Sequence, residues 1–269
     1  DQVIAALEIA SHPDRPDHGR AVKREGLGNL VHKLERILGL AVHLVDEGDD
    51  RDVAHAADLE QLQRARLDTL YDADRMAAQV RDSLDRDLDD VDLAPLMSFF
   101  DSAGGRQIVA LEIAAREAMI APEVEQMARE HHAALRAERH PRIDLIDSYI
   151  ETNGLIDGNV SGALNASLQF YGGLVDGGAM RLTEAEILDE VRASAPEVRE
   201  DIADWVPAFL LMAYQPVDTA DIRAYIDLSR TAEGAALNAA LFSAYNAMYD
   251  DISYRLGRAV AQEMQTEDL

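Results

Sequence analysis

The chain has 269 residues, of which 51 are acidic and 25 are Lys or Arg, giving a formal net charge of −26. A surface this acidic repels phosphate groups, which excludes nucleic-acid binding through a basic groove. The absence of cysteine excludes disulfides and thiolate chemistry, and no apolar run approaches the ~18 residues of a membrane-spanning helix.

Apolar residues recur at helical spacing along the whole chain, and no run alternates as a strand would. Between Val31 and Leu38 they lie on one face of an expected helix, so we expect N-terminal helices over residues 1–69. Asp72 or Asp74 is placed to cap the next helix by accepting its free N–H groups.

A further helix is predicted to begin after Pro141 and to end at Gly154, because Pro suits a first helical turn and Gly commonly ends a helix. In the helix that follows, Gly162 and its small neighbours would allow another helix to approach closely.

Thr183 and Glu186 form a predicted capping box, in which each residue bonds the other's backbone N–H. This box opens one helix. A separate helix is then expected to carry Trp205 up to Pro216.

The chain contains an internal repeat. Residues 88–120 align without gaps with residues 217–249, an offset of 129 positions. Four of the eight identical pairs are alanines, but the apolar pattern also coincides. Extended backward at the same offset, the repeated unit covers about three helices, residues 74–120 and 203–249.

Each copy of the repeat contains a helix corner. Ser102 and its counterpart Thr231 are expected to cap the next helix, and Gly105 and Gly234 fall in its first turn, where a missing Cβ permits tight packing. We interpret both corners as structural. The alternative is an anion site at the helix N-terminus, but the longer glycine loop and basic side chain of phosphate cradles are missing.

The stretches FFDSAGGRQI and DLSRTAEGAALNAALFSAYNAMY resemble the bacterial domain-of-unknown-function family 2059. LYDADRM and DDISYRLGRAVAQEM are similar to alphaproteobacterial members with two copies, and the resemblance covers roughly residues 70–269. It implies an all-helical fold and a periplasmic location, and it assigns no catalytic residues. A first residue other than Met suits an exported protein without its signal peptide, but a trimmed chain would look the same.

We therefore expect an all-α, bundle-like array with two related three-helix units. Its parts are N-terminal helices at 1–69, a first repeat unit at 70–138, connecting helices at 139–200 and a second repeat unit at 201–269.

Residues 85–89 place aspartates at alternate positions, as at the start of a calcium loop. Asp90 and Leu96 stand where such a loop needs Gly and a bidentate Glu. Asp89, like its repeat counterpart Asp218, is instead expected to cap the following helix. No metal or cofactor site is predicted.

His131, His132 and His140 form a small histidine group. Adjacent residues on a helix point about 100° apart, so the first two cannot both hold one metal ion in the usual way, and we interpret them as surface histidines. Glu112 and Arg116, four residues apart, are interpreted as a surface ion pair.

Two functional classes remain. The first is a non-catalytic envelope protein that binds a protein or small ligand through a groove between the units. The second is a hydrolase whose carboxylate site is not visible in the sequence. The lack of catalytic motifs favours the first class and leaves the partner and any homo-oligomer open.

Overall fold

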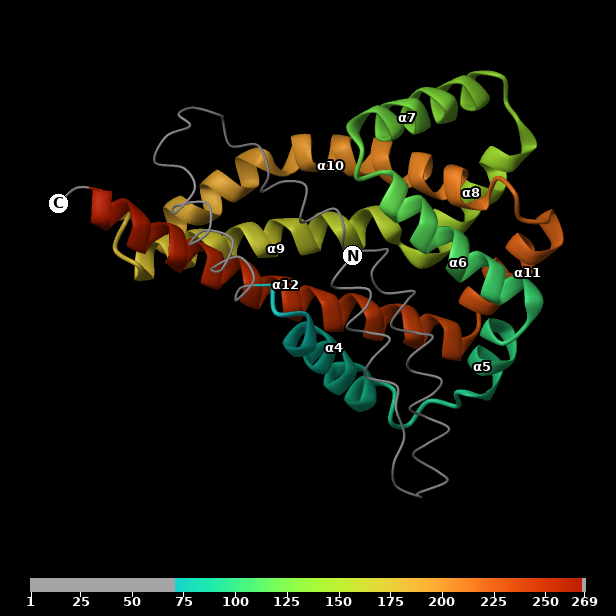
Figure 1. The fold of residues 1–269 in the computed structure, drawn as a ribbon, viewed down its shortest axis with the longest axis horizontal. Helices are drawn as coiled ribbons and strands as arrows, with labels where there is room; N and C mark the ends of the chain where they lie inside the picture. Colours follow the sequence, from blue (N-terminus) through green and yellow to red (C-terminus); the bar gives the residue numbers. More distant parts are fainter. Residues whose placement is uncertain (1–70, 268–269) are drawn as a thin grey trace, which may run out of the picture.

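The computed structural model describes residues 71–267, and this part of the chain consists of nine α-helices and the turns between them, with no strand. The predicted all-α class is thereby confirmed (Figure 1). The helices expected within residues 1–69 lie outside the described residues. In chain order the helices are α4 (Ala73–Asp87), α5 (Ala94–Phe100), α6 (Ala103–Ala118), α7 (Pro122–Ala137), α8 (Pro141–Asn153), α9 (Leu155–Asp176), α10 (Glu184–Tyr214), α11 (Thr219–Ser229) and α12 (Ala232–Glu267).

The three longest helices, α9, α10 and α12, form the body of the molecule, with α9 between the other two (Figure 1). Helix α4 packs against α12, whereas α6 and α7 pack against α10. The shorter helices α5, α8 and α11 gather at one end of the body (Figure 1).

The two repeat units share one hydrophobic core. At their junction, the ring of Phe99 in α5 stacks on Tyr225 in α11 at a centroid distance of 5.0 Å, and Phe100 meets the same ring edge-on at 5.9 Å. Tyr149 of α8 adds a third ring 4.9 Å from Tyr225. Packed aromatic side chains therefore occupy this contact between the units.

Small residues allow α9 and α12 to approach closely, as the sequence predicts for the stretch that contains Gly162. A Cβ atom on Gly162 would lie 2.5 Å from Oδ1 of Asn246. Further along, the Cα atoms of Gly173 and Gly257 face each other, and a Cβ on either glycine would overlap the backbone of the opposite helix. From the first contact to the second, the residue numbers increase in both α9 and α12, so the two helices run in the same direction.

Helix α10 is one continuous helix, so the expectation of two separate helices in this region is wrong. The predicted capping box at its start is present: Thr183 N donates to Glu186 Oε2 at 2.7 Å, and Glu186 N donates to Thr183 Oγ1 at 3.3 Å. Pro196 and Pro207 lie inside the helix. Because α10 is continuous, the expected boundary at residue 200 falls within a helix. Pro207 lies in the second half of the helix, where tertiary burial outweighs the local cost of proline.

The expected cap at Asp89 is also wrong. Asp218 occupies the N-cap position of α11, but its side chain makes no capping hydrogen bond. Asp89 lies in the turn before α5, and Asp92 Oδ1 accepts the N–H of Ala94 at 3.0 Å instead. Helix α5 begins late because Pro95 lacks an N–H and its ring would clash with a preceding helical carbonyl. The second unit has alanine at the matching position, so α11 begins a turn earlier relative to the repeat.

Candidate functional site

The two predicted corners share the same capping hydrogen bond. Gly105 N donates to Ser102 Oγ at 3.0 Å, and Gly234 N donates to Thr231 Oγ1 at 3.0 Å. Each hydroxyl thus satisfies an N–H that has no partner within its own helix. An anion at this position would have to displace the hydroxyl.

Both corner glycines lie against the end of the preceding helix. A Cβ on Gly105 would overlap the carbonyl oxygen of Phe99, and a Cβ on Gly234 would overlap that of Leu228. The overlapped residues are related by the repeat offset of 129 positions, so the two corners have the same local packing. Their geometry gives these four residues a structural role.

Glu112 is buried, so its interpretation as part of a surface ion pair is wrong. Its exposed fraction is 1%, and its Oε1 accepts the hydroxyl of Tyr214, a residue of α10, at 2.5 Å. Arg116, one turn later, lies over the ring of Trp205 at 5.3 Å. The repeat contains a signal for this burial: the counterpart of Glu112 is Leu241, which is fully buried.

The histidine group divides into three environments. His131 is exposed, as expected, but His132 is only 6% exposed and is not a surface residue. His140 is the N-cap of α8, where its Nδ1 accepts the N–H of Arg142 at 3.2 Å. One histidine is therefore part of a helix–helix contact and another caps a helix.

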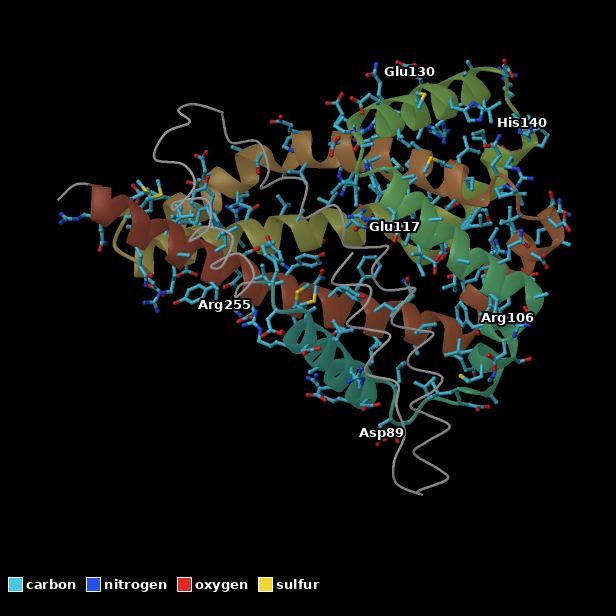
Figure 2. The ribbon with its side chains drawn as sticks, viewed as in Figure 1. Asp89, Arg106, Glu117, Glu130, His140 and Arg255 are labelled. Carbon is cyan, nitrogen blue, oxygen red and sulfur yellow. The ribbon has the colours of Figure 1, made fainter. Side chains whose placement is uncertain are left out.

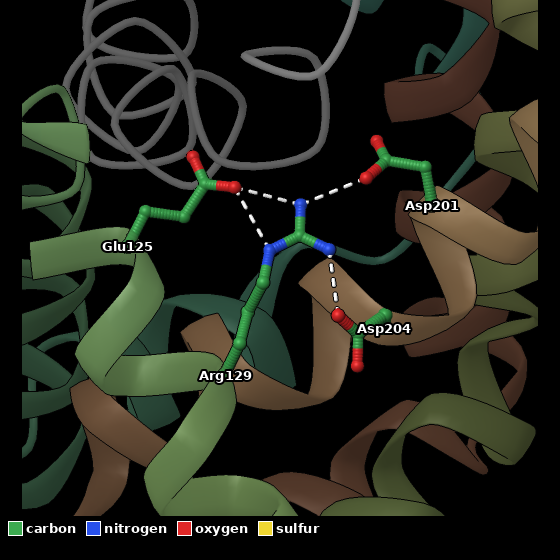
Figure 3. A network of polar contacts seen from close by, with 4 residues as sticks. All are labelled: Glu125, Arg129, Asp201 and Asp204. Carbon is green, nitrogen blue, oxygen red and sulfur yellow. Dashed lines mark hydrogen bonds and ion pairs between the residues drawn. The ribbon is translucent and has the colours of Figure 1, made fainter. Parts of the chain in front are cut away.

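Helix α7 lies on the outside of α10 and is held there by an arginine with three carboxylate partners (Figure 3). Arg129 contacts Glu125 of its own helix at 2.7 Å and reaches Asp201 and Asp204 of α10, each at 2.8 Å. Burial disfavours its charge, but the hydrogen bonds to the three carboxylates outweigh this effect and raise the pKa of Arg129 further above its ordinary value.

His132 lies one turn beyond this network on the same helix. Its Nε2 accepts a hydrogen bond from Nε of Arg136 at 3.4 Å, and Arg136 Nη2 contacts Asp147 Oδ1 of α8 at 2.5 Å. Burial, and secondly the charge of Arg136, lower the pKa of His132, whereas Asp147 and Asp204 oppose the shift. The docked helix therefore favours the neutral imidazole.

The opposite face of α7 is exposed and partly apolar. Met127 is 60% exposed, and Ile120 in the turn before the helix is 75% exposed. Glu123, Glu130 and Ala134 are also exposed on α7, and Figure 2 shows Glu130 on its outer side. We call these five residues the outer face of α7. The sequence analysis did not identify this face, although Ile120, Met127 and Ala134 recur every seven residues.

The aspartates of residues 85–89 do not form a calcium loop. Asp85 and Asp87 lie within α4, and Leu96, at the place of the bidentate Glu, is fully buried in the core. Across the described residues, no group of three or more His, Asp or Glu side chains is arranged to hold a metal ion. None of the helices between residues 71 and 267 carries an apolar stretch sufficient to span a bilayer.

Comparisons with known proteins gave no match to a family model, to a curated protein or to a solved structure.

Proposed function

We propose that this protein is a non-catalytic interaction module of the bacterial cell envelope and that it binds a protein partner through the outer face of α7. The observation that carries the proposal is the exposure of Ile120 and Met127, at 75% and 60%, in the turn before α7 and on α7 itself, at the edge of the molecule. Among the described residues these are the two most exposed large apolar side chains, and exposed apolar groups that form a patch are typical of interaction surfaces. The envelope location rests on the family resemblance.

The partner that fits this face is an amphipathic helix with basic residues beside its apolar stripe. Met127 and Ala134 are seven residues apart and so lie on the same side of α7, as positions that pack against a second helix do. Glu123 and Glu130 flank them, and the whole chain carries a charge of −26. Complementary charge would favour a basic partner over an acidic one.

The contact between the repeat units is a weaker candidate for the binding surface, since Phe99, Phe100 and Tyr225 fill it. A carboxylate-based hydrolase would need a carboxyl group that a substrate can reach. Glu112 is 1% exposed. Asp250 of α12 is half-buried, and burial raises the pKa of its carboxyl group. A raised pKa at one carboxyl group does not by itself define a hydrolase site.

The proposal is tested by removing the apolar groups without adding charge. The double variant Ile120→Ser, Met127→Ser is compared with the parent as bait in envelope extract, with quantitative mass spectrometry of the retained proteins. Met264→Ser is the matched control, because Met264 is also exposed, at 49%, but lies on α12.

We expect a saturable partner that the parent and the control retain and that the double variant binds at least 10-fold more weakly, as the loss of two apolar anchors implies. Equal retention by all three proteins would contradict the proposal. Recovery of the parent from the cytoplasmic fraction of its host would contradict the envelope location.

A further inference from the structure

The inner face of α7, which contacts α10, is small and mixes apolar with polar groups. The buried residues of α7 are Ala128 and His132, and Val124 and Leu135 pack partly buried against the core. Beside them, Arg129 bonds Asp201 and Asp204, whose side chains are 45% and 53% exposed. Fewer fully buried apolar side chains hold α7 in place than hold α10, and elements of this kind open locally at a lower free energy than the core does.

His132 is the group in this contact that titrates near neutral pH. It is buried as a hydrogen-bond acceptor, with Nε2 directed at the Nε–H of Arg136. The charged groups around it are Arg136 on its own helix, Asp147 on α8 and Asp204 on α10. Arg136 is bonded to Asp147, and Asp204 is bonded to Arg129, so both carboxylates already have cationic partners.

We propose that α7 is an acid-released arm: binding of a proton at Nε2 of His132, which is buried where α7 meets α10, undocks α7 from α10. The bond that Nε2 loses is to Arg136 of the same helix, so the buried positive charge, and not the loss of that bond, drives the undocking. Protonation turns Nε2 from an acceptor into a donor and places a buried imidazolium beside a guanidinium. The proton is taken up from solvent, and undocking returns the charged ring to water. This device concerns the inner face of α7 and does not depend on a partner at the outer face.

The direction of the pH dependence follows from the two states of His132. Its pKa is lowered in the docked state and returns to about 6.5 in the undocked state. Well above pH 6.5 both states are neutral and docking is at full strength. As the pH falls below 6.5, the undocked state binds the proton first, so docking weakens and continues to weaken until the docked state also protonates. Between pH 7.5 and 5.0, the opening equilibrium constant of α7 should rise by up to about 30-fold.

Hydrogen exchange of the full chain measures this opening directly. Exchange in peptides from residues 122–137, corrected for the intrinsic effect of pH, is compared with exchange in residues 155–176 of α9. We expect protection of α7 to fall at pH 5.0 while that of α9 is retained. Equal protection of α7 at both pH values would overturn the proposal.

Three variants assign the effect to one histidine. His132→Gln keeps an acceptor for Arg136 but does not titrate, so the loss of α7 protection at pH 5.0 should disappear. His131→Gln, at an exposed neighbour, should behave as the parent. His140→Asn keeps an N-cap acceptor for Arg142 without titrating and should also behave as the parent. A pH effect that vanishes in His140→Asn instead would overturn the proposal.

If His132→Gln leaves α7 undocked at both pH values, the NMR titration of His132 in the parent decides. We expect a midpoint below 6.5, the ordinary value for histidine. A midpoint at or above that value would overturn the proposal.

Discussion

Gly105 and Gly234 are the residues at which a single added carbon has the clearest consequence. Each lies against the backbone of the helix before it, where a Cβ would overlap a carbonyl oxygen and lie 2.9 Å from a Cα atom. Backbone atoms cannot move aside as the end of a flexible side chain can. The corner therefore requires glycine because there is no space for a Cβ atom. An unusual backbone conformation is not the reason, since the backbone at both glycines is helical.

We expect Gly105→Ala and Gly234→Ala each to lower the free energy of unfolding by about 1–3 kcal/mol through overpacking. Gly172→Ala is the matched control: Gly172 lies in α9 with nothing within 4 Å of an added Cβ, so the change should stabilise the helix by roughly 0.5–1 kcal/mol. Thermal melts with and without sulfate provide the measurement. Unchanged corner variants, together with an anion-induced shift that only the parent shows, would support an anion site.

Glu112 is a buried carboxyl group at a position where the second unit uses Leu241. The repeat thus shows that an apolar residue suits this place in the fold. Glu112 is instead coupled to Tyr214, its hydroxyl donor. We expect Glu112→Leu and Tyr214→Phe each to destabilise the protein by about 1–3 kcal/mol, because each leaves a polar group without its bonded partner.

The double variant Glu112→Leu, Tyr214→Phe should lose less than the sum of the two single losses, since the bond between the two side chains can be broken only once. Chemical denaturation of the four proteins gives the coupling energy. Strictly additive losses would show that the two residues do not depend on each other.

At the scale of elements, the backbone at the end of α7 adopts a conformation that costs free energy. Arg139 has a φ of 54°, in the left-handed region that favours glycine at the end of a helix. We expect Arg139→Gly to stabilise the turn between α7 and α8 by about 1 kcal/mol. Glu138→Gly, one residue earlier at a φ of −77°, is the control and should give no such gain. Denaturant midpoints compare the two variants, and a larger gain from the control would contradict the argument.

Helix existence was predictable from apolar periodicity, and the helix from Pro141 to Asn153 was predictable to its ends because Pro and Gly mark them. The continuity of α10 was not predictable, because Pro196 and Pro207 are locally unfavourable and the burial that surrounds Pro207 is tertiary. Adjacent histidines necessarily point apart, but which one is buried depends on how α7 docks. Which histidine is buried is therefore decided by tertiary packing and cannot be predicted from helical spacing.

The internal repeat also contains information about which positions are buried. The comparison of Glu112 with Leu241 indicates a buried position from sequence alone. The outer face of α7 was harder to predict from the sequence, because the exposure of Ile120 and Met127 follows from the placement of α7 at the edge of the molecule.

At the scale of the whole molecule, the charge of −26 determines which partners can approach. Binding to DNA or to anionic vesicles should be undetectable at physiological salt, because phosphate groups are repelled before any contact forms. Gel shift and vesicle co-sedimentation at micromolar protein provide the measurement. A shift that weakens as salt rises would reveal a local basic face.

The most direct test of the central claim, that the outer face of α7 is an interaction surface, is site-specific photo-crosslinking in cells. A photoreactive amino acid replaces Met127 on α7, and a matched protein carries it at Met264 on α12; both positions are exposed. We predict a discrete adduct with one partner protein at position 127 and no such adduct at position 264. Equal adducts at both positions, or none at 127, would contradict the claim. An adduct with a second copy of this chain would contradict the proposal of a basic partner and show that the outer face of α7 mediates self-association.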